Sequence, residues 1–157
     1  NRLEGYTTAL ERHGLPWRDE YVCPGDYTRS WDVWSASTRR LLDLSPRPTA
    51  IVASDDMVAA TAIKTIQRAG LHVPRDVAVI GVDNDELICN LAHPPLTSIV
   101  QGTEEIGHRA AELLDRLMNR RGRKPTHLLV DPVGVIKTFK KAFFSICING
   151  ETIALLV

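Results

Sequence analysis

The sequence predicts an α/β fold in which helices flank a mostly parallel sheet. Two short runs, 49–53 and 77–82, are typical of buried strands. The second is continuous in its apolar character rather than alternating, which is typical of parallel strands covered on both faces. Between the two runs, apolar residues recur at the spacing of a helix, and Gly70 follows the last of them. A strand, a helix and a second strand make a βαβ unit of the usual kind, which indicates this fold class.

Three further helices and several short strands complete the predicted order of elements. Each helix places apolar residues on one face, glycine or proline follows it, and a hydroxyl residue opens two of the three. Their ends are marked by Gly14, by Ser30 and Pro46, and by Thr103 and Gly122. The other segments expected to be extended are 21–23, 97–100, 128–130 and 133–136.

The composition is that of an ordinary globular domain. The 157 residues are enough for one hydrophobic core, and 19 basic against 19 acidic residues leave no net charge that would favour nucleic acid or membrane. No apolar run approaches the roughly 20 residues of a membrane span. The 3 cysteines lie far apart and the 5 histidines show no metal-ligand spacing, so we expect no disulfide scaffold, no metal site and a cytoplasmic protein. The chain begins at Asn1 without an initiator methionine, which indicates a piece of a longer protein.

Acidic residues cluster where the two strands of the βαβ unit end. Ser54, Asp55 and Asp56 follow the first strand, and Asp83 opens an Asp-Asn-Asp-Glu sequence after the second. Ligands of open α/β sheets bind outside the carboxyl ends of the strands. Helix capping alone would explain Asp55 and Asp56, because side-chain oxygens and negative charge suit the first turn of a helix. A single turn does not require Asp83 together with the two acids that follow it, so we expect Asp83 to contact a ligand.

Two kinds of ligand would use such acids. A phosphoacceptor or magnesium site is the less favoured, because the usual lysine is missing from the strand ends and neither glycine-rich phosphate loop occurs. A sugar site needs a carboxylate that accepts from two hydroxyls, a guanidinium that donates, and an aromatic face against the ring. The candidates are Asp83, Arg2 and either Tyr27 or Trp31. A solvated helix start is the alternative for Arg2, and core packing is the alternative for the tryptophan.

Five stretches of the sequence, taken together, resemble one family. They are 2–6, 48–55, 70–77, 79–84 and 94–99. In these stretches, their order and their spacing, the chain resembles the effector-binding domain of the lac repressor family of transcription regulators. That domain has a two-lobed fold of the periplasmic-binding-protein-like type I. Residues 81–87 and 101–111 are most similar to xylose operon regulators, which join this sensor to an AraC-type DNA-binding region.

The resemblance implies a domain that is incomplete in this chain. Residues 1–136 would form part of a sugar-binding effector domain, with 1–100 mainly in the C-terminal lobe and 101–136 crossing back toward the N-terminal lobe. Residues 137–157 depart from the family and receive no assignment. Ser54 stands where relatives often have asparagine, and Gln101 lies at the crossing between the lobes. The implied ligand contacts are Arg2, Tyr27, Ser54, Asp55, Asp83 and Gln101.

The expected function is the sugar-sensing part of a transcription regulator, without enzymatic activity, cofactor or metal. A sugar effector would bind between the lobes and shift their relative orientation, and the xylose-type similarity favours a pentose. The protein would act as a homodimer whose DNA-binding domains lie outside this chain. Two alternatives stay open: a periplasmic sugar receptor of a transport system, and a phosphoacceptor or metal-dependent α/β protein. An upstream helix-turn-helix would indicate the regulator, and an export signal would indicate the receptor.

Overall fold

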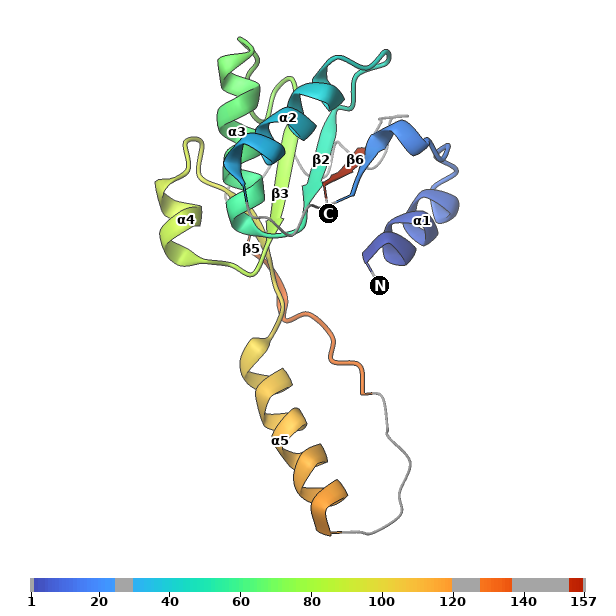
Figure 1. Cartoon of the computed structure of the whole chain (residues 1–157), viewed down its shortest axis with the longest axis vertical. Helices are drawn as coiled ribbons and strands as arrows, with labels where there is room; N and C mark the ends of the chain where they lie inside the picture. Colours follow the sequence, from blue (N-terminus) through green and yellow to red (C-terminus); the bar gives the residue numbers. More distant parts are fainter. Residues whose placement is uncertain (1, 25–29, 120–127, 137–152, 157) are drawn as a thin grey trace.

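A single mixed sheet organises the molecule. The computed structural model describes residues 2–24, 30–119, 128–136 and 153–156. Within these residues, 6 strands form one sheet in the order β1-β6-β2-β3-β4-β5, and neighbouring strands run parallel except for β5, which is antiparallel to β4 (Figure 1). The strands are β1 Val22–Cys23, β2 Ala50–Ala53, β3 Ala78–Val82, β4 Thr97–Val100, β5 Gly134–Ile136 and β6 Ile153–Leu156. The predicted α/β class with a mostly parallel sheet is confirmed.

Helices connect the strands much as the hydrophobic pattern predicts. They are α1 Arg2–Arg12, the 3-10 turn η1 Asp19–Tyr21, α2 Trp31–Leu42, α3 Asp56–Arg68, α4 Glu86–Leu91 and α5 Thr103–Asn119. Gly14 and Gly70 follow α1 and α3 with φ of +64° and +79°, the left-handed conformation with which glycine ends helices. The sequence did not predict α4, because six residues are too few to show a helical period. Residues 128–130 were expected to be extended, but they form no strand in the described chain.

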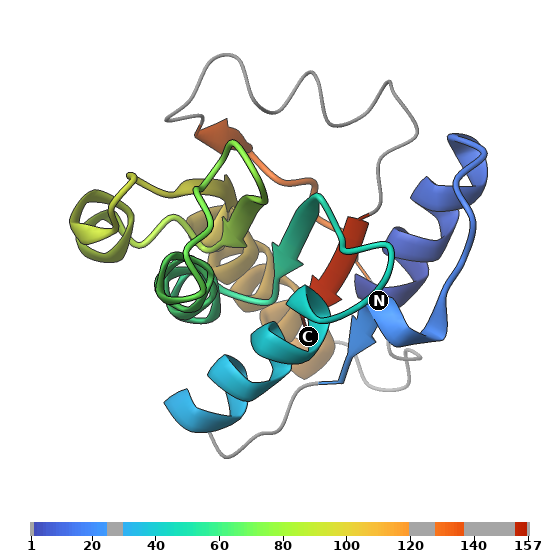
Figure 2. The same ribbon diagram turned by 90° about the horizontal axis from the view of Figure 1, so that it is seen from above.

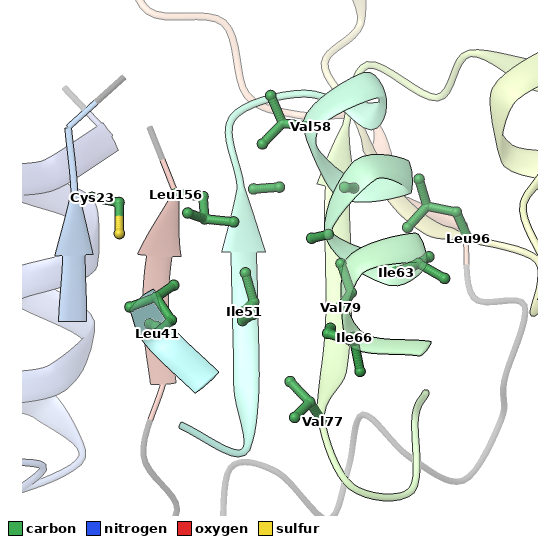
Figure 3. Close-up of a cluster of buried hydrophobic side chains, with 14 of the residues drawn as sticks. Cys23, Leu41, Ile51, Val58, Ile63, Ile66, Val77, Val79, Leu96 and Leu156 are labelled. Atoms are coloured by element: carbon green, nitrogen blue, oxygen red, sulfur yellow. The ribbon is translucent and has the colours of Figure 1, made fainter. Parts of the chain in front are cut away.

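The two faces of the sheet are covered by different helices (Figure 2). On one face, Leu41 of α2 and Ile66 of α3 pack with Ile51 and Val79 in the main hydrophobic core (Figure 3). On the other face, α1 packs against the sheet through Tyr6 and its neighbours. Successive residues of a strand point to opposite faces, so a strand covered from both sides must be apolar throughout. All five residues of β3 are buried, which explains its continuous apolar sequence.

One strand of the core comes from the C-terminal segment of the chain. β6 lies between β1 and β2, where Leu155 pairs with both Val22 and Val52. Three of its four residues are no more than 3% exposed. The sequence left 137–157 without an assignment, because the strands that flank β6 lie far upstream and four apolar residues do not specify their partners. The rest of that segment lies outside the described residues.

The longest described helix, α5, extends away from the sheet and the other helices (Figure 1). It follows β4, and the chain returns to the sheet at β5, beside β4. None of its residues is buried by the described part of the chain. Leu114 is 59% exposed and Met118 is 75% exposed, so its apolar side contacts solvent. No helix in the described ranges combines the length and the apolar character that crossing a bilayer requires.

Candidate functional site

Three predicted segments meet at the carboxyl edge of the sheet. Because β2, β3 and β4 are parallel neighbours, residues 54–55, 83–85 and 101–102 all follow strand ends on the same side. The two acidic clusters therefore share one rim, as their positions in the βαβ unit predicted. Gln101 joins them from β4. The edge thus gathers carboxylates, a carboxamide and a hydroxyl, which are groups that hydrogen-bond to polyhydroxy compounds.

Asp83 lies directly after β3. Its side chain is exposed, and its Oδ1 accepts a hydrogen bond from Nε2 of Gln101. Its own backbone N–H donates to the carbonyl oxygen of Ile99 at 2.9 Å. The carboxylate is therefore not used to cap backbone amides among the described residues. Asp83 and Gln101 form one polar pair that projects from the rim.

Asp55 has a structural role that the sequence predicted. It is the N-cap of α3, and its Oδ1 accepts from the backbone N–H of Val58 at 2.8 Å. The hydroxyl of Ser54 donates to the other oxygen, Oδ2, at 3.4 Å. Capping of α3 by Asp55 is confirmed. Contact of Ser54 or Asp55 with a ligand stays a prediction, and it would have to use the lone pairs left by these bonds.

Asp56 differs from its prediction as a second capping residue. The side chain is only 2% exposed and turns into the sheet instead of toward the first turn of α3. Oδ1 accepts from the hydroxyl of Ser98 at 2.6 Å, and Oδ2 accepts from the backbone N–H of Asp85 at 2.7 Å. Asp56 lies in the first turn of α3, as predicted. Its expected use as a cap is wrong, because tertiary donors from β4 and from the loop after β3 bind its carboxylate. Sequence reasoning placed Asp56 at this edge but missed its buried role, and it missed Ser98 altogether.

Cys89 of α4 lies against the same carboxylate. Its Sγ is 3.5 Å from Oδ2 of Asp56, and the residue is buried. Burial, and after it the negative charge of Asp56, raise the pKa of the Cys89 thiol to about 12. The thiolate is disfavoured by both effects. Cys89 is therefore a packing residue rather than a nucleophile.

The remaining predicted residues are less closely tied to the rim. Arg2 is exposed in the first turn of α1, and Figure 1 shows the amino end of α1 on the same side of the sheet as the strand carboxyl ends. Tyr27 lies outside the described residues. Trp31 opens α2, and its exposed ring lies 5.9 Å from that of Trp34, measured between ring centroids. Trp31 therefore remains available as an aromatic surface, and Trp34 is partly buried against the core.

Two surface hollows among the described residues include none of the predicted site residues. One, of about 440 Å³, is formed along α1 and includes Glu4 and Arg12. The other, of about 370 Å³, lies between the ends of α2 and α3 and includes Asp43 and Arg68. Within the described residues, no three His, Cys, Asp or Glu side chains are placed to hold a metal ion. Neither hollow includes Asp83 or Gln101.

Comparison of the sequence with known proteins identifies its relatives. A family model described as a periplasmic binding protein-like domain matches residues 1–137. Catabolite control protein A of Priestia megaterium is 40% identical over 119 residues, which are 76% of this chain and 35% of that protein. The transcriptional repressor CytR of Escherichia coli strain K12 is 41% identical over 113 residues, which are 72% of this chain and 32% of that protein. The chain spans about a third of the length of these curated relatives.

Solved structures give the same relationship. The complex of the transcriptional regulator CelR with cellobiose superimposes with a TM-score of 0.74 at 33% identity, over 87% of this chain and 40% of that one. A regulatory protein of the LacI family from Chloroflexus aggregans also has a TM-score of 0.74, at 36% identity over 87% of this chain and 48% of that one. These relatives are transcription regulators rather than enzymes, as expected for this domain. The chain belongs to the periplasmic binding protein-like domain family, within the effector-binding domains of LacI-family transcription regulators.

Proposed function

We propose that this chain is part of the sugar sensor of a transcription regulator, and that Asp83 is its main ligand contact. The exposed pairing of Asp83 with Gln101, at the carboxyl edge of parallel strands, is the observation that carries the proposal. A carboxylate in this position accepts from hydroxyl groups through charge-assisted hydrogen bonds, which are roughly twice as strong as neutral ones. The relative CelR, whose complex with cellobiose has the same fold, supports a carbohydrate as the ligand class.

The other predicted contacts surround this pair in the proposal. Gln101 would orient the Asp83 carboxylate and offer its own amide oxygen to the sugar. Ser54 and Asp55 would contribute from the end of β2, and Arg2 would donate from the start of α1. Tyr27 would supply the aromatic face. In each case the support is the residue's position in the chain and its chemistry, together with the family resemblance.

The proposed protein has a second lobe that this chain contains only in part. We assign 1–100 mainly to the C-terminal lobe and 101–136 to the crossing toward the N-terminal lobe. The support is that α5 extends away from the sheet with its apolar side exposed. Ligand bound between the lobes would shift their orientation by its difference in affinity for the two states. In a cytoplasmic homodimer, that shift would control DNA-binding domains located outside this chain.

A pentose is the proposed sugar, on the basis of the xylose-regulator similarity of 81–87 and 101–111. The relatives support the regulator over the periplasmic transport receptor, which would share the fold. The phosphoacceptor alternative is weakened by the geometry of the acids. Asp55 caps α3 and Asp56 is buried against Ser98, so neither joins Asp83 in an acidic pair that faces solvent.

The experiment is a calorimetric titration of the complete parent protein with D-xylose, L-arabinose, D-ribose and cellobiose. We expect one pentose to bind wild type, and Asp83→Ala to weaken that binding by at least about tenfold, because a hydrogen bond to a charged group contributes about 1.5–3 kcal/mol. Asp43→Ala, which removes an exposed carboxylate at the far end of α2, is the matched control and should bind as wild type. Equal affinities of wild type and Asp83→Ala would remove Asp83 from the site. No binding of any of the four sugars would contradict the proposed function.

A further inference from the structure

The loop after β3 has an unusual backbone at the residue that carries the proposed function. Asp83 has a φ of +106° and Asn84 has a φ of +56°. L-amino acids with side chains rarely adopt positive φ, and two in succession are costly. Such a conformation persists only where the surrounding structure holds it. The contacts that hold this loop therefore decide where the Asp83 carboxylate lies.

Three successive backbone amides of the loop are each held by a defined acceptor. Two of the acceptors belong to β4, and the third is a buried carboxylate of α3. The bonds run from Asp83 N–H to the Ile99 carbonyl at 2.9 Å, from Asn84 N–H to Ser98 Oγ at 3.0 Å, and from Asp85 N–H to Asp56 Oδ2 at 2.7 Å. The loop is thus fixed at every residue between the end of β3 and the cap of α4.

Asp56 and Ser98 form the buried centre of this arrangement. Ser98 is fully buried and Asp56 nearly so, and the Ser98 hydroxyl donates to Asp56 Oδ1 at 2.6 Å while it accepts from Asn84. A carboxylate removed from water is costly unless donors satisfy it. Here the donors come from β4, from the loop and from α4, through Cys89. The pair therefore ties three segments to one point beneath the rim.

The sequence of β3 makes room for this pair. A Cβ atom built on Gly81 would lie 2.2 Å from Oδ1 of Asp56, a distance that no real contact allows. Glycine is needed here because the carboxylate approaches the strand backbone closely. Gly81→Ala would displace the Asp56 carboxylate without removing it. The contact between Ser98 and Asp56 can therefore be disturbed in two independent ways, by removing the Ser98 hydroxyl or by adding a methyl group at Gly81.

We infer that Asp56 and Ser98 are positioning residues for the ligand site: they hold loop 83–85 so that the Asp83 carboxylate projects beside Gln101. The inference rests on the proposed function, in which Asp83 contacts the sugar. It adds that two buried residues, neither of which reaches the rim surface, set the affinity for that sugar. Substituting them moves Asp83 relative to its ligand rather than removing a ligand contact.

The test combines a measurement of the loop with a measurement of binding, in the complete parent protein. Hydrogen exchange followed by mass spectrometry reports the protection of a peptide that spans 83–88, and calorimetry reports the affinity for the best pentose among D-xylose, L-arabinose and D-ribose. We expect Ser98→Ala and Gly81→Ala to increase exchange in this peptide and to weaken pentose binding by at least about tenfold, the loss that follows when charge-assisted bonds are misplaced. Ser98→Thr keeps the hydroxyl and should restore both values.

The matched control is Thr65→Ala. Like Ser98→Ala it removes a buried hydroxyl, but this one lies on α3, at the end of the helix away from the rim. It should lower the melting temperature without changing pentose affinity or the exchange of 83–88. Wild-type affinity in Ser98→Ala, or unchanged loop exchange in both Ser98→Ala and Gly81→Ala, would overturn the inference and leave the proposed function standing. Failure of wild type itself to bind would instead overturn the proposed function and, with it, this inference.

Discussion

At the scale of single residues, four aspartates after β2 and β3 have the same chemistry but three different surroundings. Asp55 and Asp85 each accept from the backbone N–H three residues later and cap α3 and α4. Asp56 is buried beneath the rim, and Asp83 is exposed on it. Capping oxygens stabilise helix ends, a buried carboxylate organises donors around itself, and only an exposed one can exchange water for a ligand. Three of these aspartates therefore stabilise the structure, and Asp83 is the proposed ligand contact.

Cys89 provides a test of the buried side of this arrangement. Its pKa is raised to about 12, first by burial and then by the charge of Asp56, whereas an unfolded cysteine titrates near about 8.5. Because the native state favours the neutral thiol, Cys89 stabilises the native state below about pH 8.5. This contribution to stability is lost as the pH rises toward 12. Native protein at pH 8 should therefore resist alkylation of Cys89 by iodoacetamide, while urea-denatured protein is alkylated.

Mass spectrometry of the peptide that contains Cys89 measures this difference directly. Asp56→Asn removes the nearby negative charge but leaves much of the burial, so it should increase alkylation only modestly. Rapid alkylation of native wild type at pH 8 would contradict the buried position of the thiol.

At the scale of elements, β6 shows how a short segment completes a core. It lies between β1 and β2, it is almost fully buried, and its Ile153 carbonyl accepts a hydrogen bond from the Tyr6 hydroxyl at 2.6 Å. Without it, β1 and β2 would have no partner on their facing edges, and unpaired edge groups buried under α1 and α2 would be costly. The main core and the contact with α1 therefore both depend on this C-terminal strand.

Leu155→Ala should destabilise the chain strongly. Truncation of a buried leucine typically costs about 2–5 kcal/mol, because apolar contacts are lost and a cavity remains. Urea denaturation monitored by circular dichroism measures the change in the free energy of unfolding. Leu129→Ala is the matched control, since Leu129 is 95% exposed, and it should stay within about 0.5 kcal/mol of wild type. A small effect at Leu155 would mean that β6 does not occupy the centre of the sheet in solution.

At the scale of the whole molecule, α5 extends away from the sheet and the other helices (Figure 1). Its helix is regular and amphipathic, yet its apolar side contacts no core in the described residues. Amphipathic helices in folded proteins bury that side against another layer. In the proposed two-lobed protein, the rest of the N-terminal lobe provides the missing layer. In the same proposal, the facing lobe would cover the exposed Asp83 side chain.

Two lysine substitutions on α5 test this proposal. Leu114→Lys with Met118→Lys should change the stability of the 157-residue chain by no more than about 0.5 kcal/mol, as is usual for surface positions. In the complete parent protein the same pair should lower stability by several kcal/mol, because charged groups would be buried against the other lobe. Thermal melts of both proteins make the comparison. Equal effects in the two would argue against α5 as part of the crossing between lobes.

Local sequence was sufficient to predict much of the fold and part of the candidate site. The apolar runs of β2 and β3, and the glycines after α1 and α3, depend only on neighbouring residues, and each is confirmed. The placement of 54–55 and 83–85 on one rim follows from the direction of parallel strands. Helix capping by Asp55 also follows from local sequence, because donor and acceptor are three residues apart.

The remaining features were decided by contacts between residues that are distant in the chain. Asp56 turns inward because Ser98 and the amide of Asp85 meet it there, and no local pattern distinguishes it from a helix cap. β6 joins the sheet through strands far upstream, and Gln101 meets Asp83 only because β3 and β4 are neighbours. The sequence by itself therefore determined most of the elements, their order and the acidic rim, but not α4 or β6, since periodicity and capping act over a few residues. Only the tertiary structure decided which acid is buried and which is exposed, because hydrogen-bond partners and burial depend on the packing of the whole chain.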